Sequence, residues 1–229
     1  MRRIAGLIFM LLCFVLFGCG GREAMVLDAS TPSPSLEPRF TVALDFGHGG
    51  FDGGAVGVDS GVIEAELNLI VGNMVKERLE RGNIAVVLTR ADGEALAETK
   101  QEDMHLRGEI LCGEDIDIVI SIHMNKFSDR SVRGPMVYYQ AGAKAGQLLA
   151  QTIMDALTQA VGRPARLASP GNNYVTRIPT APAALIECGF LSNAEEEKLL
   201  QDAEYQAQLA DGIANGIFTY FTNLGIALD

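Results

Sequence analysis

The sequence has few basic residues, few histidines and no apolar run long enough for a comfortable membrane span. Its 18 lysines and arginines stand against 29 aspartates and glutamates, which gives a formal net charge of −11. Proteins that bind nucleic acid usually present a basic face, so this balance argues against a nucleic-acid partner. No internal repeat is visible, and the hydrophobic fraction of 48% is typical of a globular protein. With only 3 histidines in 229 residues, the place of each one is informative.

The N-terminus has the features of an export signal. Two arginines precede an apolar stretch, residues 4–17, which is too short for a comfortable membrane span but typical of a signal peptide. The stretch ends in "LFGCG", which resembles the lipobox of bacterial lipoproteins, where the cysteine is lipidated. We therefore predict a lipoprotein-type signal peptide at 1–19 with lipid on Cys19; the alternative is an uncleaved anchor with an incidental cysteine. Both place the rest of the chain outside the cytoplasmic membrane and attach it to that membrane.

The segment after the signal is predicted to be a tether. Residues 20–39 are rich in proline, serine and threonine, a composition typical of a disordered linker. Of the 4 cysteines, Cys13 leaves with the predicted signal and Cys19 takes the lipid. For Cys112 and Cys188 the compartment permits a disulfide, but nothing in the sequence requires one. We expect two free thiols, both mostly buried.

From residue 40 the chain alternates short apolar segments, rich in β-branched residues, with longer amphipathic ones. This pattern predicts one α/β domain over 40–229, with a largely parallel or mixed central sheet flanked by helices. Ile70 and Leu148 are expected on buried helix faces. In such sheets ligands bind beyond the carboxyl ends of the strands. The predicted strands are 40–46, 84–89, 117–123, 135–140 and 183–188, and the predicted helices are 63–81, 101–112, 144–161, 195–201 and 204–224.

Ionisable side chains follow or end three of the predicted strands. His48 follows the first strand in "GHGGFDGG", His123 ends the third, and Glu187 lies inside the apolar "AALIECGF". Glu64 opens the helix after the glycine-rich segment. Two histidines and a carboxylate make a catalytic zinc set with a position open for water, and a further carboxylate beside the metal can act as a general base. The glycine segment lacks the Lys-Ser/Thr pair of a phosphate loop, and its Asp52 would repel a phosphate, so we interpret the glycines as a tight turn that projects His48 over the sheet.

Each of these residues also has a simpler interpretation. A lone histidine after a glycine turn is more often a surface or hydrogen-bonding residue, and Glu64 at a helix start complements the helix dipole. Glu187 is harder to explain, because a carboxylate in an apolar strand costs free energy unless it is paired or bound to metal. His105 lies in the polar stretch "QEDMHLR", away from the predicted strand ends, and is interpreted as a solvated helix residue.

Five segments resemble, in the same order, the zinc-dependent N-acetylmuramoyl-L-alanine amidases of the amidase-3 family: "LDFGHGGFDGGAVG", "GVIEAELNL", "VVLTR", "DIVISIHMN" and "PAALIECGFLSNAEEEKLL". The likeness runs from about Thr41 to the C-terminus and implies a zinc amidase/phosphorylase-like fold. It also implies that His48, Glu64 and His123 bind zinc and that Glu187 is catalytic. The implied reaction is hydrolysis of the amide between N-acetylmuramic acid and L-alanine in bacterial peptidoglycan, with Glu187 as the base.

Some details depart from the family pattern or leave alternatives open. The family usually reads Asp-Pro-Gly-His, and Phe46 replaces the proline here, which changes the stiffness of the loop but not the ligand chemistry. The single-domain form, "DGGAVG" and "PAALIECGFLSN" are most similar to the spore-cortex amidases. Asn125, two residues past His123 along a strand, is a candidate for orienting substrate or for capping a loop. The rival functions are another zinc hydrolase of wall peptides and a non-catalytic wall-binding lipoprotein, and no activator protein is named by the sequence.

Overall fold

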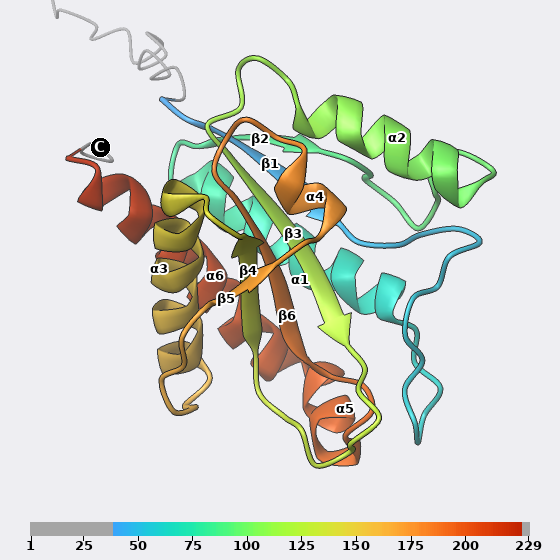
Figure 1. Ribbon diagram of the computed structural model, residues 1–229. Coiled ribbons are helices and arrows are strands. Elements are labelled where there is room, and N and C mark those ends of the chain that lie inside the picture. Colours follow the sequence, from blue (N-terminus) through green and yellow to red (C-terminus); the bar gives the residue numbers. More distant parts are fainter. Residues whose placement is uncertain (1–38, 226–229) are drawn as a thin grey trace, which may run out of the picture. The chain divides into compact units, whose positions relative to one another are not determined.

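The computed structural model describes residues 39–225. The predicted signal peptide, Cys19 and the predicted linker up to residue 38 lie outside these residues. None of the helices in the described part is both long and apolar enough to cross a membrane. The elements shown in Figure 1 are β1 (Thr41–Phe46), α1 (Glu64–Arg81), β2 (Ala85–Leu88), α2 (Lys100–Leu111), β3 (Ile118–Asn125), β4 (Met136–Gln140), α3 (Lys144–Ala160), β5 (Ser169–Gly171), α4 (Tyr174–Arg177), β6 (Ala183–Phe190), α5 (Ala194–Leu200) and α6 (Ala203–Asn223).

The strands form one mixed, six-stranded sheet in the order β2-β1-β3-β6-β4-β5. β1 pairs in parallel with β2 and β3, and β3 pairs in parallel with β6, so the carboxyl ends of these four strands meet at one end of the sheet (Figure 1). β4 runs antiparallel to β6, with Met136 opposite Glu187. The predicted α/β fold with a largely parallel or mixed sheet is therefore confirmed.

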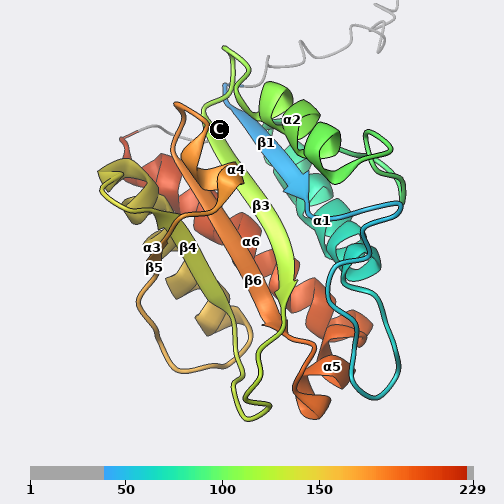
Figure 2. The same cartoon turned by 45° about the vertical axis from the view of Figure 1, so that its right-hand side comes forward.

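The side chains of each strand alternate between two faces of the sheet. In β3, Ile120 and Ile122 face a core that they form with α1, α3 and α6. On the opposite face, Val119 belongs to a smaller cluster with Leu111 and Val175 at α2 and α4. Figure 2 shows α2 and α4 toward the amino ends of β3 and β6, and no other described helix over the carboxyl ends on that face. The helices therefore cover only part of the face on which His123 lies.

Two residues predicted on buried helix faces, one in α1 and one in α3, are exposed. Ile70 and Leu148 are 42% and 46% exposed, whereas Val71 and Leu149, each one residue further along, are fully buried. One residue along a helix is a rotation of about 100°, so the apolar stripe that faces the core is set by the neighbouring residues. The helices themselves lie where the periodicity predicts them.

Two short elements were missed, and the burial of one thiol was predicted wrongly. β5 and α4 have only 3 and 4 residues, too few for a periodic pattern, and the sequence analysis missed both. β5 covers the outer side of β4, so β4 lies one strand from the edge. Cys112 and Cys188 are both free, but Cys112 is exposed because it follows the last turn of α2, while Cys188 is buried in β6.

Candidate metal centre

His48 is placed by the glycine-rich loop between β1 and α1. The loop turns back on itself through a bridge between Gly49 and Asp52. His48 has a φ of 64°, in the left-handed region that costs a non-glycine residue about 1–2 kcal/mol. The guanidinium of Arg107 donates to the His48 carbonyl oxygen at 2.6 Å, which helps to hold this backbone conformation.

His123 and Glu187 come from neighbouring strands. They are register partners in the parallel pair of β3 and β6, so their side chains lie on the same face near the carboxyl end of the sheet. The His123 ring meets the His48 ring edge to face, with centroids 5.0 Å apart and an interplanar angle of 82°. Two of the predicted strand-end residues are thus in direct contact, and the third lies on the adjacent strand.

Glu64 joins the two histidines. It is buried at the start of α1, where its Oε1 lies 2.8 Å from Nδ1 of His123 and 3.3 Å from Nε2 of His48. Its Oε2 accepts a hydrogen bond from the backbone N–H of Ala55 at 2.7 Å. Burial opposes ionisation of Glu64, but the hydrogen bonds and positive charges of the two imidazoles outweigh it and hold the pKa of this carboxyl well below its usual range.

These three side chains fit a zinc ion. One ligand atom from each of His48, Glu64 and His123 lies within 4.8 Å of the other two. Two imidazoles and a carboxylate are the donor set of catalytic zinc sites, which leave a fourth position open. Two glycines make this packing feasible, because a Cβ on Gly47 would overlap the His123 ring and one on Gly54 would lie 2.6 Å from Glu64 Oε2. The glycines around His48 therefore allow ligand side chains to come close to the backbone.

Glu187 lies beside this cluster, and one of its two carboxyl oxygens is buried and unbonded within the described chain. Its Oε2 atom is buried and has no hydrogen-bond partner among the described residues. Burial raises the pKa of Glu187 to about 7, against the positive charge of His123 and with support from the negative charge of Glu64. A carboxyl group that titrates near neutrality can both accept and release a proton under physiological conditions.

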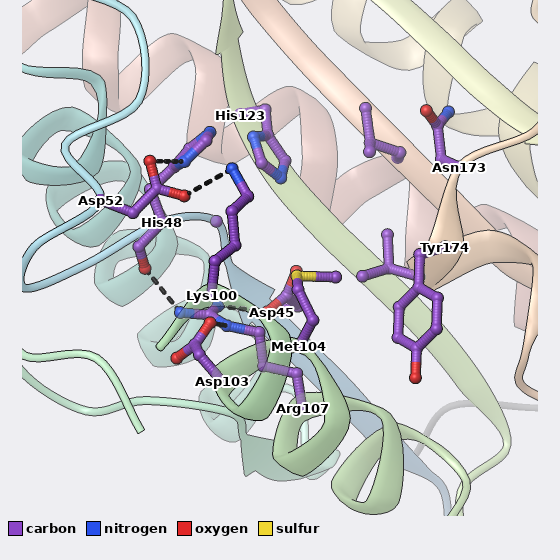
Figure 3. A pocket seen from close by; sticks show the side chains of 13 residues that line it. Asp45, His48, Asp52, Lys100, Asp103, Met104, Arg107, His123, Asn173 and Tyr174 are labelled. Atoms are coloured by element: carbon purple, nitrogen blue, oxygen red, sulfur yellow. Dashed lines mark hydrogen bonds and ion pairs between the residues drawn. The ribbon is translucent and has the colours of Figure 1, made fainter. Parts of the chain in front are cut away.

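Asp52 orients the ring of His48. Its Oδ1 lies 3.1 Å from His48 Nδ1, and its Oδ2 lies 2.9 Å from Nζ of Lys100, the first residue of α2 (Figure 3). Because Nδ1 faces Asp52, the nitrogen that faces Glu64 is Nε2. In metal sites a carboxylate at the second ring nitrogen fixes the tautomer and the orientation of the histidine. From the sequence, Asp52 was expected only to repel a phosphate, and its contact with His48 was not predicted.

A buried ion pair supports the same loop. Arg107 and Asp45 have side chains that are each 2% exposed, and Arg107 Nη1 lies 2.7 Å from Asp45 Oδ1. Asp45 also accepts hydrogen bonds from the hydroxyls of Thr89 and Ser121, at 2.8 and 2.7 Å. The sequence analysis missed this pair. Asp45 carries a signal that could have revealed it, a carboxylate inside an apolar strand, whereas Arg107 in a polar helix carries none.

Two further residues singled out in the sequence lie outside the cluster. Asn125 is the last residue of β3, and its Oδ1 accepts a hydrogen bond from the backbone N–H of Lys126 at 2.8 Å, which is the geometry of a loop cap. His105 lies on α2 with its side chain 70% exposed and 3.5 Å from Glu109. It is the solvated histidine that the sequence predicted.

Comparison with known proteins identifies the family. The amidase-3 family model, described as N-acetylmuramoyl-L-alanine amidase, matches residues 42–219. The chain belongs to the amidase-3 family. The resemblance found in the sequence and the predicted enzyme class, an N-acetylmuramoyl-L-alanine amidase, are thereby confirmed.

Similar proteins match most of the described chain. The germination-specific N-acetylmuramoyl-L-alanine amidase of Bacillus subtilis (strain 168) is 33% identical over 193 residues, which cover 80% of this chain and 81% of that protein. The solved structure of the CwlD amidase from Clostridioides difficile, in complex with the GerS lipoprotein, has 31% identity and a TM-score of 0.76 over 80% of this chain and 99% of its own. The catalytic domain of CwlV, an amidase from Bacillus (Paenibacillus) polymyxa, has 33% identity and a TM-score of 0.72 over 82% and 99%.

Proposed function

We propose that this amidase uses zinc to hydrolyse the amide bond between the lactyl group of N-acetylmuramic acid and L-alanine in peptidoglycan. The observation that carries the proposal is the meeting of His48, Glu64 and His123 within 4.8 Å, next to Glu187, whose buried Oε2 has no hydrogen-bond partner among the described residues. Membership of the amidase-3 family supplies the class of bond that is cleaved.

His48, Glu64 and His123 would hold the ion. Zinc, when bound, supplies a Lewis acid that polarises the amide carbonyl and makes water a better nucleophile. Glu64 contributes a negative charge that its low pKa keeps ionised over the physiological range. Asp52 keeps the His48 ring in the tautomer whose Nε2 is free to act as a ligand.

Glu187 would carry the proton transfers. It accepts a proton from the attacking water and returns it to the leaving amine nitrogen of L-alanine. Its buried Oε2 has no competing hydrogen bond within the described protein, so this oxygen is open to a proton from water. Asn125, whose Oδ1 is already engaged with the backbone, is assigned the role of loop cap in preference to substrate binding.

The proposed place of action is the peptidoglycan outside the cytoplasmic membrane, and more narrowly the spore cortex. The extracytoplasmic site is supported by relatives named as cell wall amidases, and the cortex by the germination-specific amidase of Bacillus subtilis. The lipobox-like sequence supports attachment to the membrane through lipid on Cys19.

Mass analysis of digested peptidoglycan tests the activity. The zinc-loaded protein is incubated with purified spore cortex and, separately, with vegetative wall. An amidase of this class frees L-alanine amino termini and leaves the glycan strands intact, whereas a peptidase shortens the stem peptide and a deacetylase lowers the mass of the sugars. Cortex cleaved in preference to vegetative wall supports the narrower assignment. The proposal is wrong if no L-alanine amino terminus appears on either substrate.

A further inference from the structure

A groove rich in arginine lies at the end of the sheet beyond β3 and β6. The loop between β3 and β4 and the start of α5 lie together there (Figure 1). The groove has a volume of about 470 Å³, and Arg133 also lines a second hollow of about 160 Å³ on its other side. The arginines of the two hollows are Arg130, Arg133, Arg163 and Arg166.

Arginines are concentrated on this surface of an acidic chain, although Glu195 also lines the groove. Four arginines gather here in a protein whose net charge is −11. The guanidinium of Arg130 forms no ion pair with any described residue, and that of Arg166 donates to the backbone carbonyl of Arg133 at 2.9 Å. Arg133 faces Glu195 at 3.3 Å, but both side chains are more than half exposed, so this pair is weak and open to exchange. Arg163 pairs with the buried Glu196 at 3.4 Å, so the guanidinium groups open to an anion are those of Arg130 and Arg133.

The walls of the groove are fixed by buried side chains of α5. Glu197 accepts a hydrogen bond from the backbone N–H of Ser60 at 2.7 Å, and Glu196 accepts one from that of Gly134 at 2.7 Å. Both glutamates are only 1% exposed. Asn193 donates its side-chain amide to the backbone of the β3–β4 loop at 2.8 Å. The loops on either side of the groove are therefore held in place before any ligand arrives, which lowers the entropic cost of binding.

The groove lies within a short stretch of chain from Glu187. Glu187 and Ser192, which lines the groove, are five residues apart along β6 and the turn that follows, a span of at most about 17 Å. An extended peptide of about five residues covers a similar distance. The proposed scissile bond has a peptide on its amine side, and that stem peptide carries free carboxylates. Arginine recognises carboxylates through paired N–H groups that match their geometry.

We infer that Arg130 and Arg133 form a subsite for the carboxylates of the acidic stem peptide of peptidoglycan. The inference rests on the proposed function, because it takes the substrate of that reaction as the ligand. It makes the arginine groove a determinant of substrate choice: stem peptides with free carboxylates are preferred over the same peptides with amidated carboxyl groups.

The test compares two soluble muropeptides that differ only in amidation of the stem-peptide carboxyl groups. The zinc-loaded full chain should cleave the free-carboxylate form with a kcat/KM about tenfold higher, mainly through KM, as expected for charge-assisted hydrogen bonds in an exposed groove. The double variant Arg130→Gln/Arg133→Gln should lose this preference, through a fall of about tenfold in kcat/KM on the free-carboxylate form, and should keep its zinc content. Arg130→Lys/Arg133→Lys should restore part of it. Arg81→Gln, an exposed arginine in the last turn of α1, is the matched control and should keep the wild-type preference.

Two results would overturn this inference and leave the proposed function intact. They are an equal kcat/KM of the wild type on both muropeptides, or a preference that persists in the double glutamine variant. A loss of kcat on both forms in that variant, with zinc retained, would also contradict it, since the arginines would then act on the reaction centre and not on the peptide charge. Failure of the zinc-loaded wild type to cleave either form would refute the proposed function, and this inference with it.

Discussion

Replacing Glu187 by glutamine keeps the size and hydrogen-bonding shape of the side chain but removes the group that accepts a proton. General-base catalysis typically contributes about 10² to 10⁴-fold. We therefore expect Glu187→Gln to cleave muropeptides at least about a hundredfold more slowly, which corresponds to about 2.7 kcal/mol of barrier. Zinc content should not change, because the three proposed ligands are untouched.

The same substitution should stabilise the metal-free protein at alkaline pH. Burial raises the pKa of Glu187 from 4.5 to about 7, so the folded protein holds this proton more tightly than the unfolded chain does. Between pH 4.5 and 7 the folded state therefore loses stability as the pH rises, and above pH 7 the cost is complete. The full shift corresponds to at most about 3 kcal/mol, and the partial exposure of the side chain reduces it to about 1–2 kcal/mol. Glutamine carries no such cost.

Chemical denaturation of the metal-free proteins at two pH values measures this difference. The variant and the wild type should have similar free energies of unfolding at pH 4, where both side chains are neutral, and the variant should be more stable at pH 8. Added zinc should reduce the gain, because a nearby cation lowers the pKa of the Glu187 carboxyl. Glu109→Gln, which changes an exposed glutamate on α2, is the control and should alter neither stability nor rate.

Three results would refute this reasoning about Glu187. A gain in stability of equal size at both pH values would come from packing and not from a desolvated charge. Loss of zinc from the variant would make Glu187 a fourth ligand and imply a closed, structural site. Near-normal cleavage would mean that another group takes the proton from water.

The other predictions concern the proposed ligands, their support and the N-terminus. We expect elemental analysis to find one zinc ion per chain, which His48→Ala and His123→Ala should each remove and His105→Ala should keep. Zinc loss from the His105 variant with retention in the His48 variant would exclude the proposed ligand set. Asp52→Asn should weaken zinc affinity about 10- to 100-fold in competition with a chelator, and an unchanged affinity would show that the contact to His48 has no such role. Cys19→Ser should abolish lipid modification and release the protein from membranes, and a protein that stays tightly bound after signal cleavage would contradict the lipobox.

The fold could be predicted because its main elements are long enough to show their period. Buried parallel strands appear as apolar β-branched runs, and the helices between them are amphipathic over at least two turns. The two missed elements, β5 and α4, have 3 and 4 residues, so neither is long enough to repeat its pattern twice. The sequence also could not show which of two adjacent apolar residues of a helix is buried. Ile70 and Val71 are both apolar, and only packing decides between them.

The site could be predicted in part because a parallel sheet brings distant strand ends together. His123 and Glu187 are neighbours because β3 lies next to β6 in the sheet and the two residues are register partners. The contact of Glu64 with both histidines depends instead on how the loop between β1 and α1 folds back, which no periodic pattern records. The ion pair of Asp45 with Arg107 was missed for a similar reason: it joins a strand to a helix 62 positions away, and only the structure shows which partner the buried aspartate has.

The support of the two histidines is unequal, and this asymmetry locates the weak point of the centre. His123 lies in β3, which pairs with β1 as far as Ile122 and with β6 through Glu187 opposite His123, so the sheet holds its backbone. His48 lies in a loop with a positive φ, and α2 holds it at two points: Arg107 binds its carbonyl oxygen, and Lys100 acts on its ring through Asp52. Movement of α2 would therefore act first on His48, one of the three proposed ligands. Zinc affinity should consequently depend on a helix that supplies none of the proposed ligands, and it should be more sensitive to changes there than to changes of similar size around β3.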